Sequence, residues 1–149
     1  VVDMPPGTGD IQLTMAQNVP LSGAVIVTTP QDIALLDARK GIEMFRKVEV
    51  PLLGIVENMS THVCRECGHH EAIFGEGGGD AIAAEYGVQM LGRLPLSMDI
   101  RQQADGGQPP LVADPSGDTS QLFRAMARQI LVAIDNNVDA GPVIQIIED

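Results

Sequence analysis

The sequence predicts an α/β fold with a mostly parallel sheet flanked by helices. Its 149 residues are the length of one domain. Two apolar runs, 23–29 and 51–57, are typical of strands buried on both faces. The segment between them, 31–47, repeats apolar residues at helical spacing. Strand, helix and strand in this order predict a parallel pair with a right-handed crossover.

Other elements flank this unit. Val1 and Val2 predict the end of a strand, and a short helix is expected over 10–17. After the second strand comes a long loop, 58–79, and loops of that length are usually functional or disordered. No internal repeat is visible in the chain.

The second half continues the alternation of helices and strands. Asp80 is a predicted N-cap for a helix over 81–86, and Gly87 is a predicted stop. The remaining expected elements are a strand over 88–94, a short helix over 96–104, a turn-rich segment over 105–117, a helix from Asp118 to about Asp135 and an acidic tail over 136–149.

Composition and charge exclude several functions. Aromatic residues make up 3% of the chain, and 9 Lys and Arg stand against 20 Asp and Glu. A net charge of -11 repels nucleic acid and anionic membranes, so neither is an expected partner. No signal peptide or membrane-spanning run is visible, which predicts a cytoplasmic location. The missing initiator Met indicates a fragment.

A carboxylate followed by a proline- and glycine-rich turn opens the chain. In DMPPGTGD, Asp3 follows two apolar residues, and Gly7 and Gly9 follow two prolines. A carboxylate at the carboxyl end of a parallel strand lies where such sheets bind ligands, and it can hold a hydrated Mg²⁺ ion. Glycines let backbone N–H groups approach a terminal phosphate. These residues predict a nucleotide site, with a simple turn as the alternative.

The long loop carries both cysteines and all three histidines. Cys64 and Cys67 form a C-x-x-C pair, with His62, His69 and His70 nearby. Two thiols at this spacing can chelate one soft metal centre. Because a zinc ion or a cubane cluster takes four ligands, either histidines complete a zinc site or two chains share a cluster across a two-fold axis. A redox dithiol and inert surface cysteines also stay open.

Two residues follow predicted strands at the same edge as Asp3. They are Asn58 and Pro95. An Asn side chain has a donor and an acceptor for an adenine edge, although stabilising its own turn is the alternative role. The glycine-rich run 74–80 lacks the Lys and Ser/Thr of a phosphate loop, so it predicts a hinge or a close helix approach.

Six motifs occur together in one order: DMPPGTGD, VTTPQDIALLDARKGIEMF, GIVENMS, CRECG, IFGEGGG and LGRLPL. On these motifs, over about residues 1 to 130, the chain resembles the carboxyl-terminal part of the Mrp/ApbC family of P-loop ATPases. These are iron–sulfur cluster carriers related to MinD and nitrogenase iron protein. The resemblance implies a MinD-like P-loop NTPase fold. Residues 1–135 would be part of the ATPase domain, with 58–79 as its metal-binding loop and 136–149 as an acidic tail.

The resemblance implies roles for the nucleotide residues. Asp3 matches the Walker B carboxylate, and Gly7 matches the switch residue whose amide senses the γ-phosphate. Asn58 matches the Asn that contacts adenine, with Pro95 and Leu96 flanking the base. ATP and Mg²⁺ are the implied cofactors.

The resemblance also implies a cluster and a function. Cys64 and Cys67 match cluster ligands that pair with the same residues of a second subunit around a [4Fe–4S] cluster. The implied protein is a homodimer that uses ATP to load the cluster and transfer it to apo iron–sulfur proteins. Two alternatives remain: a zinc-binding C-x-x-C/His module without ATPase activity, and a MinD-like positioning ATPase. The tail 136–149 lacks the basic amphipathic character that the second alternative requires.

Two departures from the family pattern have a consequence, whereas Ser97, in place of a common acidic residue, has no clear one. The family carries a glycine-rich Walker A loop with lysines upstream of this strand, and nothing here matches it. We therefore expect this chain alone to bind ATP poorly and to be inactive as an ATPase. Arg65 stands where many members have Pro, and its charge is expected to favour a thiolate nearby.

Overall fold

A three-stranded parallel sheet, in the order β1-β2-β5, lies at the centre of the computed structural model, which describes residues 1–5, 7, 9–64 and 66–138. Its strands are β1 (Ala24–Thr28), β2 (Leu52–Glu57) and β5 (Met90–Arg93). β2 pairs in parallel with both neighbours, so the predicted strand pairing is confirmed.

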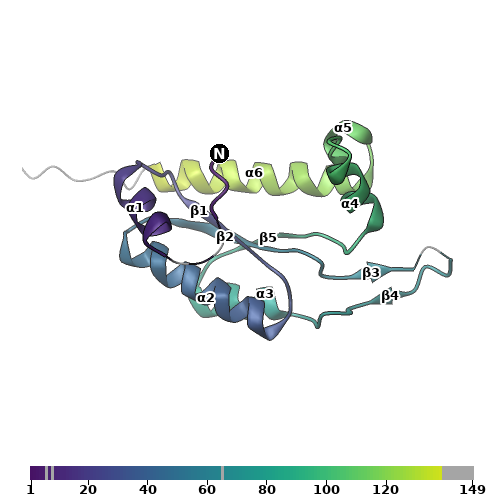
Figure 1. The fold of residues 1–149 in the computed structure, drawn as a ribbon, viewed down its shortest axis with the longest axis horizontal. Helices are drawn as coiled ribbons and strands as arrows, with labels where there is room; N and C mark the ends of the chain where they lie inside the picture. Colours follow the sequence, from purple (N-terminus) through teal and green to yellow (C-terminus); the bar gives the residue numbers. More distant parts are fainter. Residues whose placement is uncertain (6, 8, 65, 139–149) are drawn as a thin grey trace, which may run out of the picture.

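Helices cover both faces of this sheet. Figure 1 shows α2 (Asp32–Lys47) and α3 (Gly78–Tyr86) on one face and α6 (Asp118–Val138) along the other. Side chains on a strand point alternately to the two faces, so a central strand in this arrangement must be apolar throughout. The expected α/β fold with flanking helices is therefore confirmed.

Two apolar clusters hold these layers together. In the larger cluster, Ile42 of α2, Ile55 of β2 and Ile82 of α3 are completely buried. In the smaller cluster, Val56 of β2 packs with Met126 of α6. Adjacent residues of β2 thus enter different clusters, which explains why this strand reads as one unbroken apolar run.

The predicted long loop contains a small hairpin. β3 (His62–Val63) and β4 (His70–Glu71) pair antiparallel and project beyond the end of the parallel sheet (Figure 1). We call residues 61–71 the cysteine hairpin, because both cysteines lie between these strands. The remaining described helices are α1 (Asp10–Asn18), α4 (Met98–Asp105) and α5 (Pro110–Ala113).

Two local predictions are wrong. α3 begins at Gly78 rather than after Asp80, and its N-cap is Gly77, whose φ of 73° is left-handed. Glycine adopts that conformation at little cost, so the helix can begin earlier than a side-chain cap would allow. Val1 and Val2 lie in no strand, because no described strand offers them a partner for backbone hydrogen bonds.

The last helix runs further than expected. α6 begins at Asp118 as predicted but continues to Val138, so the first three residues of the predicted tail 136–149 are helical. Residues 139–149 lie outside the described residues. Among the helices that are described, none is long and apolar enough to span a bilayer.

Glycine is required inside β2. Gly54 has a φ of 147°, and a Cβ there would lie 2.6 Å from the Gln89 carbonyl oxygen and 2.7 Å from Leu91 Cγ. Gly41 in α2 is different, because a Cβ there would meet Ile26 Cδ1 at 3.9 Å, an ordinary contact. The two glycines therefore form a matched pair for substitution.

We expect Gly54→Ala to lower the free energy of unfolding by about 2–3 kcal/mol, because the backbone carbonyl and Leu91 must both move. Gly41→Ala should raise it by about 0.5–1 kcal/mol, since Ala is the better helix former. Urea unfolding followed by circular dichroism measures both. Equal effects of the two substitutions would contradict this account.

Candidate functional site

The carboxyl ends of the parallel strands are joined by backbone hydrogen bonds. Asn58 N–H donates to the Thr28 carbonyl at 2.7 Å, just beyond the ends of β1 and β2. Leu94 N–H donates to the Glu57 carbonyl at 2.9 Å. These bonds bring Asn58 and the segment leading into Pro95 to one edge of the sheet, as predicted.

Asn58 also orders its own turn. Its Oδ1 accepts the N–H of Met59 at 2.9 Å, and Met59 has a left-handed φ of 56°. This is the local role that the sequence left open as the alternative. Because an amide oxygen has two lone pairs and the amide nitrogen is a separate donor, the same side chain can still contact a base.

The two cysteines flank a tight turn. Cys64 N–H donates to the His69 carbonyl at 2.9 Å, and Gly68 N–H donates to the Cys64 carbonyl at 2.9 Å. Both thiols are free; Cys64 is half-buried and Cys67 is exposed. The cysteine hairpin thus places two thiols on one turn, where both are at least partly accessible to solvent.

Hydrogen bonds to sulfur favour the thiolate of Cys64. The backbone N–H of Cys67, then that of Glu66, and then the Cys67 thiol lower the pKa of Cys64, and slight desolvation opposes them. The thiolate is the form that binds metal ions. Arg65, whose charge was expected to help, lies outside the described residues.

Among the described residues, the histidines are not grouped with the cysteines as metal ligands. His69 and His70 are exposed, whereas Nδ1 of His62 lies 3.3 Å from the Leu96 carbonyl oxygen. Among the residues that the structure describes, no three His, Cys, Asp or Glu side chains are grouped to hold a metal ion. A zinc site within one chain therefore has no support here.

The cysteine hairpin is bonded to the segment predicted to flank the base. Leu96 N–H donates to the Thr61 carbonyl at 2.9 Å, and Leu96 forms an isolated parallel bridge with His62. Pro95 and Leu96 are both half-buried beside this contact. The predicted base-contacting segment and the predicted cluster-binding segment thus share hydrogen bonds.

The residues before α1 share no hydrogen bond with this edge in the part of the chain that the structure describes. Asp3 and Gly7 are exposed, and Gly7 has a φ of 100°. Within the described residues, no hydrogen bond joins either of them to Asn58 or to Pro95. Their roles at a nucleotide therefore stay predictions.

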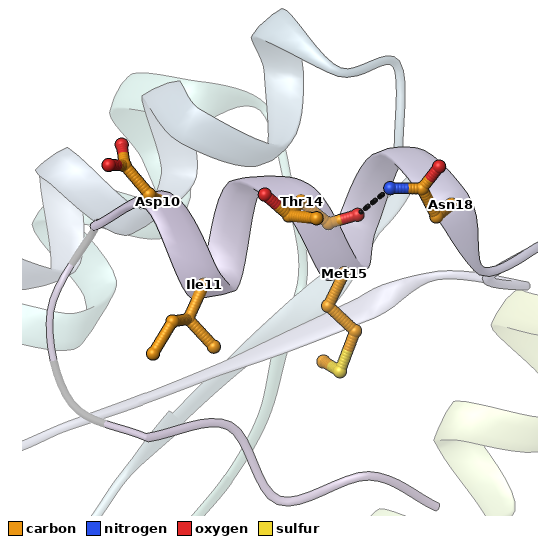
Figure 2. Close-up of a pocket in the computed structure, with 5 residues that line it drawn as sticks. All are labelled: Asp10, Ile11, Thr14, Met15 and Asn18. Carbon is orange, nitrogen blue, oxygen red and sulfur yellow. Dashed lines mark hydrogen bonds between the residues drawn. The ribbon is translucent and has the colours of Figure 1, made fainter.

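A shallow hollow lies on α1. Figure 2 shows its five lining residues, and the Asn18 side-chain amide donates to the Thr14 carbonyl at 2.7 Å. The hollow measures about 420 Å³. Its lining consists of Asp10, Ile11, Thr14, Met15 and Asn18, all from this one helix. It contains none of the predicted site residues, and we assign it no function.

A buried carboxylate at the candidate site, Glu57, was not predicted from the sequence. Glu57 ends β2, directly before Asn58, and its side chain is 3% exposed. Oε2 accepts the N–H of Gly79 at 2.7 Å, and Oε1 lies 3.9 Å from Arg93 Nε. The only sequence signal is an acidic residue at the end of an otherwise apolar run.

The lowered pKa of Cys64 has a measurable consequence. Because the hydrogen bonds exist only in the folded chain, we expect Cys64 alkylation by iodoacetamide to reach half-maximal rate at lower pH in the folded protein than in concentrated urea. Cys67→Ser should raise that midpoint only slightly, since the main donors are backbone groups. Mass spectrometry of the modified peptides measures the rates. Identical pH profiles in folded and unfolded protein would contradict the assignment.

Comparison with known proteins identifies the family. A family model described as NUBPL iron-transfer P-loop NTPase, within the ParA group, matches residues 1–131. The iron-sulfur cluster carrier protein of Pseudomonas fragi is 62% identical over 127 residues, which cover 85% of this chain and 44% of that protein.

Two solved structures share the fold. A nucleotide-binding protein from Archaeoglobus fulgidus, solved in complex with ADP, has a TM-score of 0.66 at 36% identity, over 80% of this chain and 48% of that one. The cell division ATPase MinD of Pyrococcus furiosus has a TM-score of 0.58 at 22% identity, over 74% of this chain and 43% of that one. The chain thus spans less than half the length of each of these proteins. Because the family model matches nearly all described residues and the fold agrees, this chain belongs to the family of NUBPL iron-transfer P-loop NTPases.

Proposed function

We propose that the complete protein is an ATP-dependent iron–sulfur cluster carrier, to which this chain contributes the cluster-binding cysteines and the base side of the nucleotide site. The observation that carries the proposal is the cysteine hairpin, whose two free thiols lie on a segment bonded to the carboxyl edge of the sheet. The name of the Pseudomonas fragi relative and the bound ADP of the Archaeoglobus fulgidus protein support the two halves of this function.

The cluster is cargo, and its stoichiometry follows from the ligands. A [4Fe–4S] cluster takes four thiolates, and one chain supplies Cys64 and Cys67. Two copies related by a two-fold axis supply four, so we propose a homodimer that shares one cluster. The projecting hairpin and the exposed Cys67 support this arrangement, because a second chain can approach the turn without moving the sheet (Figure 1).

The nucleotide residues divide into two groups. Asn58, Pro95 and Leu96 would hold the base at the carboxyl edge. Asp3 would hold Mg²⁺ through water, and the Gly7 amide would contact the γ-phosphate. An exposed carboxylate and a glycine with a left-handed φ suit these roles chemically. Bound Mg²⁺ would neutralise charge on the phosphates during hydrolysis.

The remaining parts of the proposal concern the complete protein. The phosphate-binding loop with its lysines would come from sequence outside this chain, so the chain alone would be inactive as an ATPase. The recipients are apo iron–sulfur proteins, and the location is the cytoplasm. A zinc module gains no support, because the described residues provide no third ligand beside the two cysteines.

Replacing both cysteines tests the cluster. We expect the complete protein, reconstituted anaerobically, to bind about two irons and two sulfides per chain as a dimer, and Cys64→Ala with Cys67→Ala to bind almost none. The matched control is His70→Ala, an exposed residue of the same hairpin, which should keep the cluster. Chemical analysis of iron, sulfide and zinc provides the counts. One zinc per chain without sulfide, or normal cluster transfer by the double variant, would refute the proposal.

Replacing Asn58 tests the base contact. Loss of one hydrogen bond to the base costs about 0.5–1.5 kcal/mol, so Asn58→Ala should weaken ATP binding by the complete protein roughly two- to tenfold. Asn18→Ala on α1, where the side chain bonds only to its own helix in the described residues, is the matched control. Titration with a fluorescent ATP analogue measures both. Equal affinities of Asn58→Ala and wild type would contradict the assignment.

A further inference from the structure

A buried carboxylate lies at the base of the cysteine hairpin. The chain leaves the sheet after Glu57, forms the hairpin and returns to the sheet at the start of α3. The Glu57 side chain accepts a hydrogen bond from Gly79, so the residue before the hairpin contacts the segment that follows it. None of the roles proposed above uses this side chain.

The Glu57 carboxylate contacts the first turn of α3, which follows the cysteine hairpin in the chain. Oε2 accepts the Gly79 N–H at 2.7 Å, within the first turn of α3, where backbone N–H groups favour a negative charge. Oε1 lies 3.9 Å from Arg93 Nε, and Arg93 also pairs with Asp80 in the same turn. The carboxylate therefore connects α3 to β2 and β5.

The contact between Glu57 and Gly79 is close. A Cβ at Gly79 would lie 2.9 Å from Glu57 Oε2 and 3.2 Å from Glu57 Cβ. The first turn of α3 therefore packs directly on this side chain. A shift of the Glu57 carboxylate therefore either moves Gly79, and with it the chain that returns from the cysteines, or breaks their hydrogen bond.

The backbone of the same residue belongs to the candidate nucleotide edge. The Glu57 carbonyl accepts the Leu94 N–H at 2.9 Å, one residue before Pro95, and Asn58 follows Glu57 directly. Glu57 is thus covalently attached to the predicted adenine contact and hydrogen-bonded to the segment beside it. Its side chain, in contrast, contacts the hairpin exit.

A buried ion pair is by itself weak evidence for a role in stability. Burying a carboxylate costs free energy that one helix start and one ion pair repay only in part, and apolar replacements of buried ion pairs are often neutral or stabilising. The carboxylate at this position is therefore available for a task besides stability. The geometry offers one, since the side chain connects two sites.

We propose that Glu57 is a positioning residue that couples nucleotide binding at Asn58 to the position of the cysteine hairpin through its bond to Gly79. This inference rests on the proposed function. Base binding reorients the end of β2, the carboxylate moves with it, and the first turn of α3 follows. Coupling between two ligands is reciprocal, so the bound cluster must change ATP affinity by the same factor by which ATP changes cluster affinity.

The experiment measures that factor in the complete protein. The dissociation constant of a non-hydrolysable ATP analogue is determined with and without the reconstituted cluster, and the ratio of the two constants is the coupling factor. We expect about a fivefold or greater factor for wild type, the lower end of typical couplings. Glu57→Ala should reduce the factor to one, while iron and sulfide content and the affinity of the cluster-free protein stay unchanged.

A conservative variant and a control separate positioning from folding. Glu57→Gln keeps the side-chain length and an oxygen acceptor for the Gly79 N–H, so it should restore at least half of the wild-type coupling free energy. Glu85→Gln removes a carboxylate from the surface of α3, where Glu85 pairs with Arg39 at 2.9 Å. This control variant should leave the coupling factor unchanged.

The outcomes are distinct. A wild-type factor of one, or a factor that survives Glu57→Ala, would overturn the inference and leave the carrier function intact. Loss of cluster content in both Glu57 variants together with a lower Tm would also overturn it, because Glu57 would then be a structural residue only. A wild-type protein that binds no cluster would instead refute the proposed function itself.

Discussion

Burial of β2 on both faces is the constraint on which the rest of the structure depends. Its residues enter both apolar clusters, and its glycine lets the neighbouring segment approach to within contact of the backbone. The chain leaves this strand at its carboxyl end, where Glu57 is followed by Asn58. The candidate nucleotide edge and the cysteine hairpin therefore both begin at the carboxyl end of the most buried strand of the sheet.

Most of the fold could be predicted because its signals are local. The apolar runs of β1 and β2 and the helical stripe of α2 each depend on residues near one another in sequence, and all three elements were found within one or two residues. The start of α3 was misplaced, because Gly77 begins the helix through backbone conformation rather than through a side-chain cap. Asp80 lies inside the first turn of α3 and pairs with Arg93 instead of capping the helix.

The candidate site was predictable only where a motif lies within a short stretch. The sequence placed Asn58 and Pro95 at one edge and put both cysteines on one loop, and the structure agrees. It could not reveal the bond from Glu57 to Gly79, which joins residues 22 positions apart through a close helix approach. A lone acidic residue after a strand carries no information about its partner, so contacts of this kind require the folded chain.

The outer edge of β1 affects how the isolated chain behaves in solution. Among the described residues no strand pairs with that edge, and Val27 on β1 is 63% exposed. An unpaired strand edge is a template for association with another chain. The net charge of -11 opposes the association of identical isolated chains, and dissolved salt screens that repulsion over about 8–10 Å at 0.10–0.15 M. The colloidal stability of the isolated chain is therefore set by ionic strength as well as by its folding free energy.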